Sequence, residues 1–178
     1  MVKLPGNVED NLQKIRLILL DVDGVLTDGK VGLLSSGEEV KFFSVYDGLA
    51  IRLAQRAGLE VGFISGRRSK EVDVRAAELG IKLVFQGSKN KVDNFEQILK
   101  ERELIADQVA YVGDDLPDIA LLERVGFSAA PSNAIESVRQ LVHYVTHAKG
   151  GEGAVREVVE ILLKTSGRWE GPMEVVEE

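Results

Sequence analysis

Short apolar runs alternate with amphipathic segments along this chain of 178 residues. The first run, Leu17 to Leu20, is continuously apolar and ends at an aspartate, which is typical of a strand buried on both faces of a parallel sheet. Similar runs predict strands at residues 60–64, 81–85, 108–112, 127–130 and 143–145. Apolar residues at helical spacing predict helices at residues 48–57, 69–79, 91–102, 116–124, 135–141 and 153–164.

This alternation predicts an α/β fold, a three-layer, doubly wound parallel sheet with right-handed crossovers. Two further apolar segments, residues 30–34 and 39–43, flank a polar turn and predict a β-hairpin inserted at about residues 29–43. No linker, repeat or segment long enough for a separate cap domain is visible. We therefore expect residues 1–178 to form a single domain with a flexible tail at residues 165–178.

Composition and charge narrow the classes of function. The chain carries 29 acidic and 22 basic residues, a net charge of −7, which disfavours nucleic-acid binding. It has no cysteine and two histidines, so any bound metal should be a hard cation held by carboxylates. No apolar run approaches the ~18 residues of a membrane span, and Met1–Asp10 lacks the pattern of a secretory signal. We expect a soluble, cytoplasmic protein without a membrane partner.

Acidic residues follow two of the predicted strands. Asp21 and Asp23 end the first strand, and Asp114 follows the strand at residues 108–112. The carboxyl ends of parallel strands meet at one edge of a sheet, so these carboxylates should converge there and could bind Mg²⁺ or transfer protons. Asp115 and Asp118 could support such a site, or could simply complement a helix dipole.

The first acidic pair has two simpler interpretations. An isolated Asp-x-Asp is also compatible with a solubilising loop after a strand. An EF-hand is excluded, because the twelfth position counted from Asp21 is Gly32, where a bidentate glutamate is needed.

Polar residues also follow the other predicted strands. Ser65 and Arg67 come after the strand at residues 60–64, where they could bind phosphate oxygens or could be a helix cap and a solvated arginine. Lys91 begins the helix predicted at residues 91–102 and could neutralise a phosphoryl oxygen. Each signal is weak alone, and their convergence on one sheet edge makes the combination specific.

In this order, the motifs resemble those of the haloacid dehalogenase superfamily of phosphotransferases. The resemblance spans nearly the whole chain. It is closest to the 3-deoxy-D-manno-octulosonate 8-phosphate (KDO 8-phosphate) phosphatase family. The stretches that carry it are residues 21–29, 46–48, 64–67, 110–115 and 153–157.

The resemblance implies a Mg²⁺-dependent phosphomonoesterase of lipopolysaccharide precursor biosynthesis. Asp21 would form an aspartyl-phosphate and Asp23 would transfer protons. Mg²⁺ would bind the side chains of Asp21 and Asp114 and the backbone carbonyl of Asp23, while Ser65 and Lys91 would hold the phosphoryl oxygens. The substrate-binding residues implied by position, besides Asp23 and Lys91, are Ser44, Val45, Tyr46, Asp47, Gly48, Arg52, Arg67 and Arg75.

The family's architecture also implies a homotetramer in which the hairpins pack together and neighbouring subunits cap the site. The apolar character of the hairpin supports this over a free flap. Packing of the hairpin against its own domain is the alternative. Two positions depart from the family pattern, because Tyr46 and Glu152 stand where arginine is common.

Three alternative functions differ from this one in what they would require of the sequence. A phosphatase of a nine-carbon ulosonic acid phosphate, or of a broader range of sugar phosphates, would share every proposed catalytic residue. A phosphorylated signalling receiver would place its acidic pair on the first strand and its phosphoacceptor on a later one, and would have no use for the hairpin. A silent binding module would not need the full set of acidic, serine and lysine residues.

Overall fold

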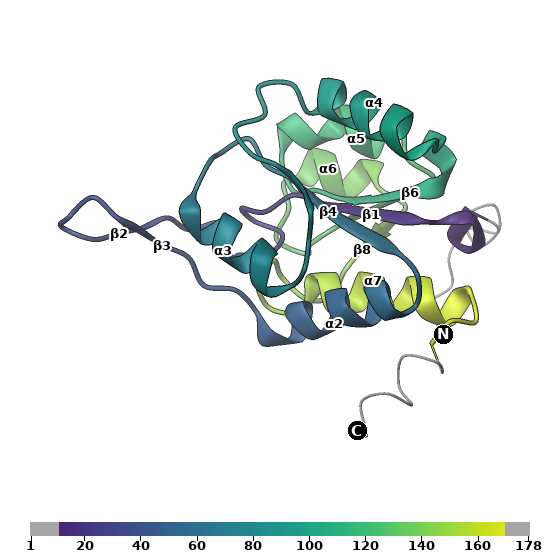
Figure 1. The fold of residues 1–178 in the computed structure, drawn as a ribbon, viewed down its shortest axis with the longest axis horizontal. Helices are drawn as coiled ribbons and strands as arrows, with labels where there is room; N and C mark the ends of the chain where they lie inside the picture. Colours follow the sequence, from purple (N-terminus) through teal and green to yellow (C-terminus); the bar gives the residue numbers. More distant parts are fainter. Residues whose placement is uncertain (1–10, 170–178) are drawn as a thin grey trace.

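The computed structural model describes residues 11–169 of the chain. Six strands form its central sheet in the order β5-β4-β1-β6-β7-β8, and every neighbouring pair is parallel (Figure 1). The strands are β1 (Leu17–Leu20), β4 (Glu60–Ile64), β5 (Leu83–Phe85), β6 (Val109–Val112), β7 (Phe127–Ala130) and β8 (Tyr144–Val145). Their carboxyl ends therefore lie at one edge of the sheet, as predicted.

Helices cover both faces of this sheet. One face is covered by α2 (Val45–Arg56), α3 (Lys70–Glu78) and α7 (Ala154–Thr165), and the other by α4 (Lys91–Arg102), α5 (Ile119–Leu122) and α6 (Glu136–Leu141) (Figure 1). The chain moves from β1 to β4 and β5, then crosses back to β6 on the other side of β1. The direction of winding thus reverses at β1, which places a topological switch point at its carboxyl end.

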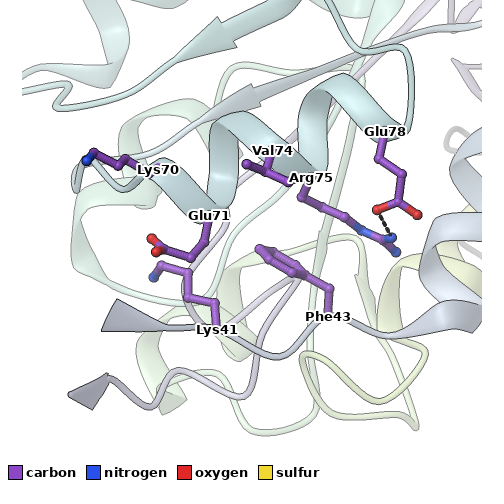
Figure 2. A pocket seen from close by; sticks show the side chains of 7 residues that line it. All are labelled: Lys41, Phe43, Lys70, Glu71, Val74, Arg75 and Glu78. Carbon is purple, nitrogen blue, oxygen red and sulfur yellow. Dashed lines mark hydrogen bonds and ion pairs between the residues drawn. The ribbon is translucent and has the colours of Figure 1, made fainter. Parts of the chain in front are cut away.

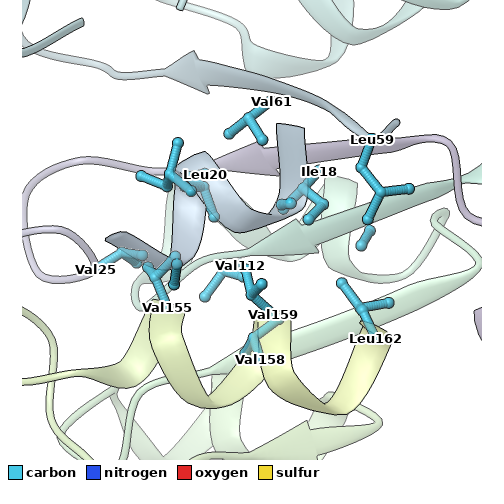
Figure 3. Close-up of a cluster of buried hydrophobic side chains, with 14 of the residues drawn as sticks. Ile18, Leu20, Val25, Leu59, Val61, Val112, Val155, Val158, Val159 and Leu162 are labelled. Carbon is cyan, nitrogen blue, oxygen red and sulfur yellow. The ribbon is translucent and has the colours of Figure 1, made fainter. Parts of the chain in front are cut away.

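The first strand is buried on both faces, as its continuous apolar run predicts. Ile18 and Leu20 point into one hydrophobic cluster, where they meet apolar side chains of α7 such as Val159 (Figure 3). Leu17 and Leu19 belong to the cluster on the opposite face. Because successive side chains of a strand point to opposite faces, this short strand joins the two cores.

Two helices differ from their predicted bounds by more than a single residue at an end. Helix α2 begins at Val45 instead of Gly48, because the Ser44 side chain caps it by accepting a hydrogen bond from the Asp47 backbone N–H at 3.4 Å. The predicted helix at residues 116–124 is divided into a 3₁₀ turn at Leu116–Asp118 and the short α5.

The inserted hairpin consists of β2 (Gly32–Leu33) and β3 (Glu39–Val40), which pair antiparallel and project from the body of the molecule (Figure 1). The pairing is shorter than the strands predicted at residues 30–34 and 39–43. Among the described residues, no helix is long and apolar enough to cross a membrane.

The predicted flexible tail began at Thr165, but that residue ends helix α7. Trp169 packs beside this helix, with the guanidinium carbon of Arg156 at 5.6 Å and Nζ of Lys164 at 4.7 Å from its ring centroid. The start of the predicted tail is therefore packed on the protein, and residues 170–178 lie outside the described part of the chain.

Candidate active site

The polar residues predicted at successive strand ends come together at one edge of the sheet. Asp21 follows β1, Ser65 follows β4, Lys91 begins the helix after β5, and Asp114 lies two residues beyond β6. They line a common cleft of about 210 Å³. The other residues lining it are Asp23, Gly66, Arg67, Asp115, Pro117 and Asp118. The predicted convergence of these residues is therefore present in the structure.

Lys91 is the buried cation at the centre of the cleft. Its Nζ lies 2.5 Å from Oδ1 of Asp21 and 2.6 Å from Oδ1 of Asp118, and it also lies 3.3 Å from the hydroxyl of Tyr111. Burial favours the neutral amine, but the negative charges of the two carboxylates outweigh this effect and raise the pKa of Lys91. Lys91 is therefore held as an ammonium group against Asp21.

Asp118 organises the loop that follows β6, residues 113–118, which is the second acidic loop of the cleft. Its Oδ1 accepts hydrogen bonds from Lys91 and from the hydroxyl of Tyr111, the latter at 2.5 Å. Its Oδ2 accepts the backbone N–H groups of Asp114 at 2.9 Å and Asp115 at 3.2 Å. Both oxygens are thus occupied by protein groups, and Asp118 fixes the loop that carries Asp114.

Three of the carboxylates that line the cleft, those of Asp21, Asp114 and Asp118, repel one another. Burial raises the pKa of Asp21 to about 7, against the opposing effect of Lys91. Burial and the charges of Asp21 and Asp118 raise the pKa of Asp114 to about 8. One oxygen from each of Asp21, Asp114 and Asp118 lies within 4.8 Å of the others. With a single lysine among them, this cluster has an excess of negative charge that a cation would offset.

The loop after Asp21 is closely packed against the second acidic loop. Gly24 has a φ of 97°, in the region that favours glycine, and its backbone N–H donates to Oγ1 of the buried Thr27 at 3.3 Å. Thr27 also accepts the N–H of Gly29 at 3.3 Å. The sequence motif after Asp21 therefore has a structural explanation: it forms a compact loop that Asp114 can approach.

The hairpin contributes residues that the sequence analysis missed. Lys41 forms an ion pair with Oδ1 of Asp23, and Nε of Arg67 lies 3.6 Å from Oδ2 of Asp23. Glu39 accepts a hydrogen bond from Arg67 at 2.6 Å. Glu39 and Lys41 alternate with Val40 along the return strand of the hairpin, by which we mean β3 and the residues that follow it (39–43). This alternation places Glu39 and Lys41 on one face and could have indicated their common direction.

The predicted substrate-binding residues divide into two groups. Arg67 lines the cleft, whereas Arg52 and Arg75 do not. Arg75 donates to the Ser44 backbone carbonyl at 3.0 Å and pairs with Glu78 at 2.8 Å (Figure 2). Arg52 donates to the Glu78 carbonyl at 3.1 Å. Both arginines therefore have structural partners beside α3, outside the cleft of their own chain.

The segment at the start of α2 also lies outside the cleft. Val45 and Tyr46 are 81% and 71% exposed, while Asp47 and Gly48 are buried. The Asp47 carboxylate accepts the backbone N–H of Gly153 at 3.3 Å and of Arg156 at 2.8 Å. Asp47 therefore caps the first turn of α7, a role that residues so distant in the sequence gave no means of predicting.

The fold and the acidic cleft define the class of haloacid dehalogenase-like hydrolases, and the model of that family matches residues 83–158. The 3-deoxy-D-manno-octulosonate 8-phosphate phosphatase KdsC of Salmonella typhimurium is 44% identical over 162 residues, which cover 91% of this chain and 86% of that protein. The chain belongs to the 3-deoxy-D-manno-octulosonate 8-phosphate phosphatase family.

Solved structures of similar proteins agree with this assignment. The phosphatase of that name from Yersinia pestis has a TM-score of 0.91 and 40% identity, covering 93% of this chain and 90% of its own. The phosphatase from Moraxella catarrhalis, solved with a magnesium ion, a phosphate ion and KDO, has a TM-score of 0.92 and 36% identity, covering 95% and 97%.

Proposed function

We propose that this chain hydrolyses KDO 8-phosphate to KDO and phosphate, as a step of lipopolysaccharide precursor biosynthesis. The observation that carries the proposal is the position of Asp21 at the switch point of the sheet, 2.5 Å from Lys91 and beside Asp114. The names of the relatives, and the KDO and phosphate in the Moraxella catarrhalis structure, support the substrate. A cytoplasmic location is part of the same proposal.

The reaction proceeds in two displacements at phosphorus. In the first, an Asp21 oxygen forms a bond to phosphorus while the bond to the sugar oxygen breaks, and Asp23 gives that oxygen its proton. In the second, water attacks phosphorus, gives a proton to Asp23 and releases Asp21. Asp23 is thus restored to its starting form after each cycle.

Two further residues bind the phosphoryl group in this scheme. Lys91 is held against Asp21 and is placed to offset the charge of the phosphoryl oxygens. The Ser65 side chain, buried at the end of β4, lines the same cleft and is placed to donate a hydrogen bond.

The donor set of the cleft fits Mg²⁺. The carboxylate oxygens of Asp21 and Asp114 lie within 4.8 Å of each other, and hard oxygen ligands are those that Mg²⁺ prefers. Asp21, Asp114 and the backbone carbonyl of Asp23 would hold the ion, while both oxygens of Asp118 are occupied by protein donors. When bound, Mg²⁺ supplies positive charge that offsets the repulsion between these carboxylates and a dianionic phosphate.

Substrate recognition is proposed to involve two subunits of a homotetramer. Arg67, which lines the cleft, would contact the substrate from its own chain. Ser44 to Gly48, Arg52 and Arg75 would act in the assembly, where the exposed Val45 and Tyr46 indicate a protein contact. The hairpin supports the same assembly, because Leu33 is 69% and Phe42 82% exposed.

The test is Mg²⁺-dependent phosphate release from KDO 8-phosphate, a nine-carbon ulosonic acid 9-phosphate, hexose phosphates and p-nitrophenyl phosphate. Preference for KDO 8-phosphate, lost on chelation and in Asp21→Asn, is the expected result. Full activity of a folded Asp21→Asn variant would exclude the mechanism. A preference for the nine-carbon substrate would favour the second candidate function. The departures at Tyr46 and Glu152 bear on this choice because they weaken the case for KDO specificity more than the case for phosphatase activity.

A further inference from the structure

The hairpin places a buried lysine against a carboxylate that lines the catalytic cleft. The Lys41 side chain is 1% exposed, and its Nζ forms an ion pair with Oδ1 of Asp23, whose side chain is 19% exposed. A buried ammonium group is costly unless a carboxylate accompanies it. The two side chains therefore restrict each other's conformations.

The second oxygen of Asp23 also faces a cation. Nε of Arg67 lies 3.6 Å from Oδ2, and the same guanidinium group is held by Glu39 at 2.6 Å. Glu39 and Lys41 both come from the return strand of the hairpin. The hairpin thus orients Asp23 directly through Lys41 and indirectly through Glu39 and Arg67.

Lys41 also borders a second hollow, of about 420 Å³, between the hairpin and α3. Glu71 of α3 points toward the Lys41 side chain there (Figure 2). An acidic side chain therefore remains next to Lys41 when Asp23 is replaced by asparagine. This makes a double-mutant test practicable.

We propose that Lys41 is a positioning residue that holds the carboxyl group of Asp23 toward the reacting oxygen. The inference rests on the proposed function, in which Asp23 transfers a proton to and from oxygen atoms in the cleft. Such transfer requires hydrogen-bond reach, and a displacement of about 1 Å can cost on the order of 100-fold in rate. Without Lys41, the partly exposed Asp23 side chain has freedom to rotate toward solvent. The hairpin would then contribute to proton transfer within its own subunit, in addition to any role in assembly.

The experiment is a double-mutant cycle of Lys41→Met and Asp23→Asn, measured with KDO 8-phosphate and with p-nitrophenyl phosphate in saturating Mg²⁺. In the wild-type background we expect Lys41→Met to lower kcat by about 10- to 100-fold for KDO 8-phosphate, with KM changed less than about 3-fold. In the Asp23→Asn background the same change should cost less than about 2-fold, because Lys41 acts through Asp23. The first displacement with p-nitrophenyl phosphate, measured as the initial burst of p-nitrophenolate, should be less sensitive, because this leaving group needs no proton. The second displacement needs Asp23 with either substrate.

Three controls separate positioning from a structural role. Lys41→Arg keeps the positive charge and should recover most of kcat. Lys70→Met removes an exposed lysine that lines the same hollow and should leave kcat unchanged. Circular dichroism and the oligomeric mass establish that each variant is folded, and Lys41→Gln provides a second substitution for the cycle.

Each contrary result has a distinct meaning. An equal loss in both backgrounds, or a loss confined to KM, would assign Lys41 to substrate binding or to the fold and overturn the inference. Wild-type kcat in folded Lys41→Met would also overturn it while leaving the proposed function intact. A wild-type protein that releases phosphate from neither substrate would overturn the proposed function and the inference together.

Discussion

Oδ2 of Asp114 lies 2.0 Å from the position that a Cβ atom on Gly24 would occupy. The carboxylate of the second acidic loop thus rests against the bare backbone of the loop that follows Asp21. Real Cβ contacts are never so short, so any side chain at Gly24 would displace Asp114. Glycine at this position determines how closely the two acidic loops approach.

Gly24→Ala should therefore impair metal-dependent activity more than it impairs stability. Gly58→Ala is the matched control, because Gly58 also has a positive φ, of 83°, but nothing lies within 4 Å of its added Cβ. The backbone strain should cost about 1–2 kcal/mol in both variants. Only Gly24→Ala should lower phosphate release, by at least about 100-fold, and raise the Mg²⁺ concentration for half-maximal activity. Equal activities of the two variants would show that the Asp114 contact is dispensable.

Lys91→Met should remove activity and destabilise the protein in the absence of Mg²⁺. It leaves Asp21 and Asp118 buried without their cation, and breaking a buried ion pair typically costs about 3–5 kcal/mol. Urea unfolding at neutral pH measures this loss, with the exposed Lys89→Met as the matched variant. Added Mg²⁺ should stabilise Lys91→Met at least as much as the wild type, because the uncompensated negative charge is larger. If Lys91→Met proved as stable as the wild type, the result would contradict a stabilising role for this ion pair.

Phe42→Asp should dissociate the proposed tetramer. Phe42 is 82% exposed on the return strand of the hairpin, and a charge there cannot be buried against a second subunit without a large cost. Light scattering after size-exclusion chromatography should show a smaller mass, and kcat/KM for KDO 8-phosphate should fall more than that for p-nitrophenyl phosphate. Ile105→Asp, at a 63% exposed residue before β6 at the opposite edge of the sheet, should change neither quantity. An unchanged mass in Phe42→Asp would exclude a hairpin-mediated assembly.

Protonation of Glu157 should make the folded protein less stable in acid. Burial opposes its ionisation, but hydrogen bonds from Tyr144, from the His147 ring and backbone, and from the Ala148 backbone lower the pKa of Glu157 below its usual 4.5. A carboxyl group whose pKa is lower in the folded state stabilises the fold above the unfolded-state pKa, and this contribution is lost as pH falls through the folded-state value.

The measurement is the urea midpoint from pH 7 down to pH 3 for wild type, Glu157→Gln and the exposed control Glu123→Gln. Glu157→Gln should be less stable than wild type at pH 7, and the difference should shrink as the pH falls below about 4.5. A difference that stays constant over this range would contradict the assignment.

The strands and the convergence of the acidic residues were predictable from the sequence, because continuous apolar runs and parallel pairing impose both. The continuous apolar run from Leu17 to Leu20 suits only a strand whose sheet is covered on both faces, and this placement brings Asp21 to the carboxyl edge of the sheet. The start of α2 was missed by three residues because the capping role of Ser44 was overlooked.

The roles of several residues could not be assigned without the structure. Asp47 caps a helix more than a hundred residues later in the chain, a contact that no local pattern encodes. Tyr111 lies in the strand predicted at residues 108–112, and a tyrosine in a fully buried strand requires a partner for its hydroxyl, but only the structure identifies that partner as Asp118. The sequence offers only a weak indication that Lys41 has a role, because it is a charged residue between the apolar Val40 and Phe42.

The position of β1 in the middle of the sheet has a consequence for biosynthesis of the chain itself. The strand is made early, yet one of its two hydrogen-bonded neighbours, β6, is translated much later. Gly150 and Gly151 come later still, and the N–H of Gly151 donates to the Val25 carbonyl at 3.0 Å to seal the loop after Asp21. An emerging chain must therefore carry an apolar, half-paired strand until β6 leaves the ribosome, which is the interval in which such chains aggregate or recruit chaperones. A chain that has not yet reached Gly151 lacks this hydrogen bond, so the loop after Asp21 is not yet sealed.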